Sequence, residues 1–200
     1  MAGSARNLPN ALTLSRVVMA IVLFALLGLV QRGLLPNARL WLNVSLGIFV
    51  TAGLTDVLDG YLARKWGQAT VFGRIVDPFA DKVIVCGTFV FLIPIDGSLV
   101  APWVVVTVLA RELLVDGLRG YAESCGVAFP AMWSGKAKMF AQSACLTWLL
   151  AMVANWPQEP WAPTINRLAQ YAVVAACVIS GLHYVQHAYR ELSQAPAEGA

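Results

Sequence analysis

The chain has 200 residues, of which 58% are hydrophobic, 12% are charged and 16 are glycine. Soluble globular domains contain about 45–50% apolar residues with glycine included, and about 25% charged residues. The composition therefore excludes an ordinary water-soluble domain and a disordered chain. The 14 basic and 11 acidic residues leave a net charge of +3, an excess too small to favour a nucleic-acid partner. We expect a single domain in a lipid bilayer.

Six stretches without Asp, Glu, Lys or Arg predict six transmembrane helices. A helix needs roughly 20 residues to cross a bilayer, and the last two stretches are that long. The other four become long enough when each is extended past a charged residue at one of its ends. In chain order the stretches are 17–31, 40–55, 83–95, 97–110, 139–158 and 168–189. Between them stand the breakers Gly33 with Pro36, Pro94 with Gly97, Gly126 with Pro130, and Pro157, Pro160 and Pro163. The prediction is an all-α integral membrane bundle over residues 1–192, with a disordered tail over 193–200.

The basic residues between these stretches predict a cytoplasmic N-terminus. With that orientation eight of them lie inside: Arg6, Arg64, Lys65, Arg74, Arg119, Lys136, Lys138 and Arg190. Arg32, Arg39 and Arg167 lie outside, and eight against three follows the positive-inside rule. The first apolar run has no small-residue cleavage site, so we expect no cleavable signal. Arg16, Lys82 and Arg111 fall within predicted spans and therefore need a structural or functional reason.

Four of the six Asp residues lie within 26 residues, at the ends of the second and third predicted spans. At about 100° per residue, one helix presents an arc of roughly 140° that contains Asp56, Asp59, Gly60, Ala63 and Arg64. The next helix presents a stripe about 80° wide that contains Gly73, Asp77 and Asp81. Carboxylates grouped near a membrane repel one another unless they are protonated or bridged by cations.

Metal binding explains these carboxylates economically. Oxygen ligands without a nearby His or Cys suit Mg²⁺ or Mn²⁺, four carboxylates are enough for two ions, and a two-metal site favours phosphoryl transfer. Gly60, Ala63 and Gly73 leave room for a phosphorylated group beside the backbone, and Arg64 offers a fork for phosphate. In a purely structural alternative, the acids form salt bridges with Arg64, Lys65, Arg74 and Lys82.

The segment TDVLDGYLARKWGQATVFGRIVDPFADK matches eight positions of a known signature, and by it the chain resembles the CDP-alcohol phosphatidyltransferase family. The resemblance implies a six-helix membrane enzyme, often a homodimer, that moves a phosphatidyl or similar group from a CDP-linked donor to an alcohol and releases CMP. It implies that Asp56, Asp59, Asp77 and Asp81 bind two divalent cations and that Asp81 is also the general base. It further implies a donor site that includes Asn10, Thr13, Gly60, Arg64 and Thr70. We add Ala63 and Gly73 to this predicted site, because these small residues leave room beside the backbone. For Asn10 and Thr13, a helix cap and first turn is a compatible alternative.

Four further cations are expected to converge near the cytoplasmic face. Arg111 and Arg119 are about 80° apart around the fourth predicted span, and Lys136 and Lys138 begin the fifth. A phosphorylated alcohol would need such a pocket, whereas a neutral alcohol would not.

The segments NLPNALTLSR, ARELLVDGLRGYAESCGVA and SGKAKMFAQ resemble a bacterial branch of the family. By this resemblance the donor is CDP-diacylglycerol, the acceptor is sn-glycerol 3-phosphate, the four cations bind the acceptor phosphate, and the enzyme lies in the bacterial inner membrane with its site on the cytoplasmic side.

Other readings stay open at this point. Lys136 and Lys138 could be interfacial anchors, and Arg111 could pair with Glu112 or Asp116, which could also orient the cations. Within the family, the acceptor could be phosphatidylglycerol, as in cardiolipin synthases, or serine or inositol phosphate. A divalent-cation transporter is a remote alternative. Transporters usually hold ions near the bilayer midplane between repeats, whereas these acids lie at the ends of predicted spans and the sequence shows no repeat.

Overall fold

The computed structural model describes residues 8–66, 71–127, 130 and 132–194, and the side chains of 14–55, 78–127, 130 and 132–193. The described residues form six helices and no strand, which confirms the predicted all-α class. The helices are α1 (Leu8–Gln31), α2 (Ala38–Trp66), α3 (Val71–Leu92), α4 (Pro102–Ser124), α5 (Trp133–Asn155) and α6 (Ala162–Gln194). Helix α6 runs to Gln194, past the predicted boundary at 192, and the rest of the predicted tail lies outside the described residues.

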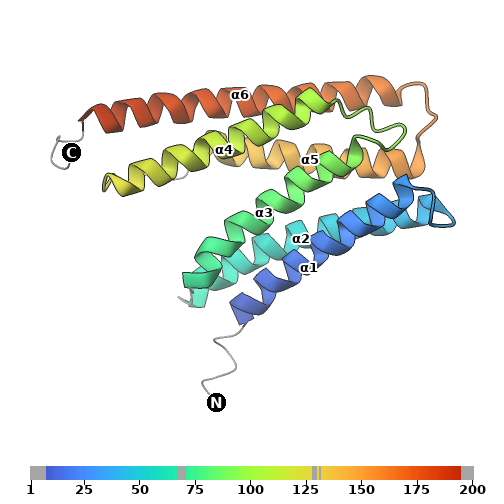
Figure 1. Ribbon diagram of the computed structural model, residues 1–200, viewed down its shortest axis with the longest axis horizontal. Helices are drawn as coiled ribbons and strands as arrows, with labels where there is room; N and C mark the ends of the chain where they lie inside the picture. Colours follow the sequence, from blue (N-terminus) through green and yellow to red (C-terminus); the bar gives the residue numbers. More distant parts are fainter. Residues whose placement is uncertain (1–7, 67–70, 128–129, 131, 195–200) are drawn as a thin grey trace, which may run out of the picture.

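The helices form two groups of three that meet at the end with the loops after α1, α3 and α5 and diverge toward the opposite end (Figure 1). Helix α1 packs against α2 and α3, while α6 packs against α4 and α5. Contacts of α2 with α5, and smaller contacts of α3 with α4 and α5, join the two groups. The starts of the odd-numbered helices and the ends of the even-numbered ones therefore lie toward the same end, where the predicted site residues are concentrated.

The helix breaks fall where the sequence places Gly. Gly33, Gly97 and Gly126 have φ of 66°, 84° and 72°, a left-handed conformation that Gly adopts without steric cost. At the end of α4 the turn is closed by the Val127 N–H, which donates to the Ala122 carbonyl at 2.9 Å, as in a Schellman-type cap.

Packing between α1 and α3 sets the position of the site. A Cβ on Gly87 would lie 2.2 Å from the Phe24 ring, so the glycine allows the two helices to approach closely. The same ring stacks on Phe91 with centroids 5.1 Å apart. Because α1 and α3 run in the same direction, this contact also brings Arg16 opposite Asp81.

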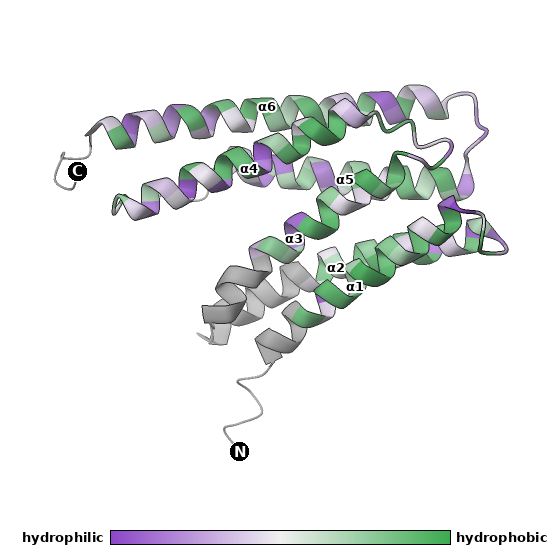
Figure 2. Cartoon of the chain, in the orientation of Figure 1, coloured by the Kyte–Doolittle hydropathy of each residue, from purple (hydrophilic) through white to green (hydrophobic). Residues whose placement is uncertain are grey.

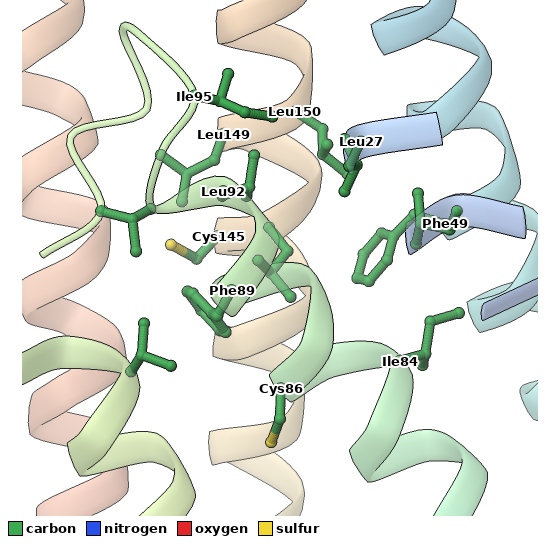
Figure 3. Close-up of a cluster of buried hydrophobic side chains, with 14 of the residues drawn as sticks. Leu27, Phe49, Ile84, Cys86, Phe89, Leu92, Ile95, Cys145, Leu149 and Leu150 are labelled. Carbon is green, nitrogen blue, oxygen red and sulfur yellow. The ribbon is translucent and has the colours of Figure 1, made fainter. Parts of the chain in front are cut away.

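The buried core takes residues from all six helices, and the close-up in Figure 3 shows it around α3 and α5. Leu27, Phe89, Leu92 and Leu149 are fully buried there. Lipid tails are as apolar as these side chains, so van der Waals packing between the helices, rather than removal from water, stabilises this core. The core thus fixes α3 and α5, whose side chains form much of the site.

Hydrophobic residues predominate along α1 and the coloured part of α2 (Figure 2), and many large apolar side chains are exposed on the bundle. Ile21, Leu113 and Phe140 are 62%, 71% and 76% exposed, which is unfavourable in water and favourable in lipid. Among the described residues, four stretches are long and apolar enough to cross a membrane: Leu14–Gln31, Ala38–Thr55, Trp133–Asn155 and Ala162–Ser193. The chain is therefore a membrane protein, and the crossing of α3 and α4 stays a prediction.

Candidate active site

The predicted acidic segment occupies the last turns of α2 and the first turns of α3. Asp56, Asp59, Gly60, Ala63 and Arg64 lie in α2, and Gly73 and Asp77 in α3. Five Cα–Cα steps separate Trp66 from Val71, so the two helix ends are at most about 18 Å apart. Thr70 lies outside the described residues, and Asn10 and Thr13 lie in the first turns of α1.

Asp81 is the one predicted metal ligand whose side chain lies in the described part of the chain. There, no three Asp, Glu, His or Cys side chains come together as metal ligands. The side chains of Asp56, Asp59 and Asp77 lie outside that part. Where the four carboxylates stand relative to one another therefore stays a prediction.

Arg16 of α1 meets Asp81 of α3. The Arg16 side chain is 4% exposed, and its Nη1 donates to Asp81 Oδ1 at 2.8 Å. A buried guanidinium requires such a partner, because an uncompensated charge in a low dielectric is costly. The ion pair gives a structural reason for the basic residue in the first span.

A largely apolar pocket of about 370 Å³ lies on one side of Asp81. Residues of α1, α2, α3 and α5 line it, among them Phe49, Gly53, Ile84 and Phe140. Its charged lining residues are Arg16, Asp81 and Lys136. We call it the apolar pocket; its size and lining are typical of sites that take an apolar ligand.

A second pocket, of about 260 Å³, lies between α3, α4 and α5 and also contains Asp81. Its other charged lining residues are Lys82, Glu112, Arg119 and Lys138. We call it the charged pocket. It shares Asp81, Val85 and Met139 with the apolar pocket, so the Asp81 carboxylate stands at the wall between the two.

Two of the three cations of the charged pocket have carboxylate partners. Lys138 pairs with Glu112, and Lys82 pairs with Asp116. Glu112 is buried and also accepts from Arg111 Nη1 at 3.3 Å. Glu112 therefore serves two cations, and the group of Arg111, Glu112 and Lys138 keeps one positive charge.

Arg119 differs from these two lysines. Its Nη2 donates to the Tyr184 hydroxyl at 3.2 Å, and its guanidinium carbon lies 5.7 Å from the centre of that ring. Its Nε is buried and, within the described part of the chain, has no hydrogen-bond partner. No carboxylate among the described side chains pairs with Arg119, so it brings an unneutralised positive charge to the charged pocket.

The four predicted acceptor cations are not all in one place. Arg119 and Lys138 line the charged pocket, whereas Lys136 lines the apolar pocket. Residues two apart on a helix point about 200° apart, which explains the separation of the two lysines. Arg111 is 8% exposed and lines neither pocket; its Nη2 donates to Ser180 Oγ at 2.6 Å.

Tyr184 is the residue near the site that sequence reasoning missed. It is 2% exposed, and both Arg111 and Arg119 lie over its ring. The pairing depends on α6 packing against α4, which local sequence does not report. Arg16 and Glu112, by contrast, could be singled out as charges within or beside apolar stretches.

The sequence matches known proteins over most of its length. Residues 6–182 match the family model described as CDP-alcohol phosphatidyltransferase. The chain is 39% identical over 194 residues to a probable phosphatidylglycerophosphate synthase of Mycobacterium tuberculosis, covering 96% of this chain and 87% of the relative.

Two further relatives are each named CDP-diacylglycerol–glycerol-3-phosphate 3-phosphatidyltransferase. The protein of Mycoplasma pneumoniae is 34% identical over 207 residues, covering 94% of this chain and 89% of the relative. The protein of Bacillus subtilis is 33% identical over 186 residues, covering 89% of this chain and 93% of the relative. The match to the family model over most of the chain and these identities show that the chain belongs to the CDP-alcohol phosphatidyltransferase family, whose members use divalent cations.

Proposed function

We propose that this enzyme transfers the phosphatidyl group of CDP-diacylglycerol to sn-glycerol 3-phosphate, giving phosphatidylglycerol phosphate and CMP. The names of the relatives at 33–39% identity support this reaction. The observation that carries the proposal is that Asp81 and the unneutralised Arg119 line one small pocket.

The charged pocket suits a phosphorylated acceptor. Its volume of about 260 Å³ is at the small end for ligand sites and fits a three-carbon phosphate ester better than a second phospholipid. A phosphate dianion would receive charge-assisted hydrogen bonds from Arg119 and Lys138. Lys136 and Arg111, the other two predicted acceptor cations, do not line this pocket, so the proposed direct contacts with the acceptor phosphate are those of Arg119 and Lys138.

The apolar pocket suits the lipid end of the donor. It opens on the same carboxylate, so a donor with its glycerol backbone there would bring its phosphates toward Asp81. The CDP end would then meet the ends of α1, α2 and α3, where the donor-site residues were predicted: Asn10, Thr13, Gly60, Ala63, Arg64, Thr70 and Gly73.

The donor set fits divalent metals. Asp56, Asp59, Asp77 and Asp81 offer oxygen ligands on two helix ends held near each other by a four-residue link, and Asp81 stands at both pockets. We propose that these residues hold two ions, Mg²⁺ or Mn²⁺. Bound there, the ions would neutralise charge on the phosphates and on the departing CMP.

In the proposed reaction, Asp81 accepts the proton of the acceptor hydroxyl as that oxygen attacks the β-phosphorus of the donor. A new P–O bond forms to the acceptor oxygen, the bond from the same phosphorus to the bridging oxygen breaks, and CMP leaves with the electron pair. Arg16 fixes the Asp81 carboxylate from behind, and Arg119 holds the acceptor phosphate so that its free hydroxyl faces Asp81.

The cellular setting is part of the proposal. The bacterial relatives favour an inner membrane. The basic residues at the end of the bundle where α1, α3 and α5 begin favour placing that end, with the N-terminus and the site, in the cytoplasm. Family resemblance also favours a homodimer.

CMP release tests the function directly. Purified protein in detergent receives CDP-diacylglycerol and Mg²⁺, with glycerol 3-phosphate, phosphatidylglycerol, serine or inositol phosphate added singly. We expect CMP release only when glycerol 3-phosphate is the added acceptor. Release with phosphatidylglycerol instead would identify a cardiolipin synthase. Release with serine would refute the assignment of the acceptor cations, whereas release with inositol phosphate would refute glycerol 3-phosphate as the acceptor and leave the cations a phosphate to bind.

A further inference from the structure

Tyr184 connects three helices beside the charged pocket. It lies on α6, just beyond residues 6–182 that match the family model. Its hydroxyl oxygen accepts from Arg119 Nη2 of α4 at 3.2 Å and from the Met132 N–H, directly before α5, at 3.1 Å. A buried tyrosine hydroxyl needs hydrogen-bond partners, and here the partners are a pocket residue and the start of the helix that carries Lys138.

The aromatic ring of Tyr184 has a second role. The guanidinium carbons of Arg111 and Arg119 lie 5.3 Å and 5.7 Å from its centre, within the range of cation–π attraction. The ring therefore stabilises Arg119 without neutralising it, whereas a carboxylate in the same place would cancel the charge that a phosphate needs.

Gly135 on α5 leaves space for this hydroxyl. A Cβ at position 135 would lie 2.9 Å from Tyr184 Oη, closer than real Cβ atoms approach, and 3.3 Å from Cε2, which is tighter than most real contacts. The Tyr184 hydroxyl fills the space that Gly135 leaves. A substitution at either residue should therefore change the position of this hydroxyl or remove it.

From these contacts we infer that Tyr184 is a positioning residue for the acceptor: it orients Arg119, without contacting the substrate, so that the guanidinium binds the phosphate of glycerol 3-phosphate. The inference rests on the proposed function. It predicts that the hydroxyl affects acceptor binding alone, and that it does so through Arg119.

The test uses full-length protein in mixed micelles, with both substrates varied. Tyr184→Phe keeps the ring and removes the hydroxyl, and we expect the KM for glycerol 3-phosphate to rise about three- to tenfold, as for the loss of one orienting hydrogen bond. The kcat and the KM for CDP-diacylglycerol should stay unchanged. Tyr189→Phe, on the same helix but 77% exposed, is the matched control and should leave all three constants unchanged.

A double-mutant cycle asks whether Tyr184 acts through Arg119. In an Arg119→Ala background, Tyr184→Phe should change the acceptor KM less than twofold. Gly135→Ala should raise the acceptor KM as Tyr184→Phe does, while Gly47→Ala, whose added Cβ meets nothing within 4 Å, should not.

Three results would overturn the inference. One is an unchanged acceptor KM in Tyr184→Phe; another is the full effect of Tyr184→Phe in the Arg119→Ala background. The third is a lower kcat and Tm with the acceptor KM unaltered, which would assign Tyr184 to the fold alone. If the unmodified enzyme does not use glycerol 3-phosphate, the proposed function itself fails, and that outcome is visible before any variant is made.

Discussion

The apolar and charged pockets share one carboxylate and differ in nearly everything else. The apolar pocket, about 370 Å³, lies among α1, α2, α3 and α5 and has mainly aliphatic and aromatic walls. The charged pocket, about 260 Å³, replaces α1 and α2 with α4 and has five charged lining residues. A reaction between a membrane lipid and a water-soluble phosphate ester needs this division, with the proton acceptor where the two substrates meet. Substitutions in either pocket should therefore separate the two substrates kinetically.

The largest effect is expected at the shared wall. Asp81→Asn removes the proposed base and one metal ligand, and we expect CMP release to fall at least about 10²- to 10⁴-fold. Asp96→Asn, in the exposed loop at the other end of the bundle, is the control for a lost carboxylate. Retained activity in a folded Asp81→Asn variant would remove the base assignment.

Arg119→Ala should have the next largest effect. Loss of charge-assisted hydrogen bonds to the phosphate raises the KM for glycerol 3-phosphate about ten- to a hundredfold, with little change in the KM for the donor. Initial rates with both substrates varied measure this. The control is Arg167→Ala, which changes an exposed arginine in α6 near the opposite end and should behave as the unmodified enzyme. If Arg119→Ala raised both KM values equally, the two substrates would not be divided between the two pockets.

The apolar pocket can be narrowed from α2. Gly53 lines it, and an added Cβ there meets nothing within 4 Å, so Gly53→Leu should fold and take up space in the pocket. We expect the KM for CDP-diacylglycerol to rise about five- to tenfold, because steric overlap between the lipid and the added side chain costs about 1 kcal/mol or slightly more. Gly47→Leu, on the same helix and outside the pocket lining, is the control. If the KM for CDP-diacylglycerol does not change, the lipid part of the donor does not bind in this pocket.

Lys136→Ala should have the smallest effect. Lys136 is exposed and lines the apolar pocket with Asp81, so the loss of its screened charge should raise the KM for CDP-diacylglycerol about two- to threefold. A rise in the KM for glycerol 3-phosphate instead would return Lys136 to the predicted acceptor cations. No change in either KM would make it an interfacial anchor.

The sequence predicted the helices well because their signals are local. Apolar stretches and the breakers Gly33, Gly97 and Gly126 depend on residues a few positions apart, and the structure ends helices at these places. The charges flagged within apolar stretches were informative for the same physical reason. Arg16 has an ion-pair partner, as a buried guanidinium requires.

The parts that sequence could not supply depend on packing between distant segments. Arg16 and Asp81 are 65 positions apart, as are Arg119 and Tyr184, and neither contact follows from a local pattern. Helical geometry alone could have predicted that Lys136 and Lys138 point in different directions. It could not have shown that Asp81 lies between the pockets that these two lysines line. The predicted arrangement of the four Asp side chains stays a prediction.

The central claim is that each pocket serves one substrate. The measurement that tests it most directly is a full kinetic comparison of Arg119→Ala, Gly53→Leu and the double variant, with both substrates varied over a wide range. We predict that each single change raises one KM only, and that the double variant shows both increases at their single-variant size, as expected for independent sites. If either single change raises both KM values alike, the two pockets do not separate the substrates and the account is wrong.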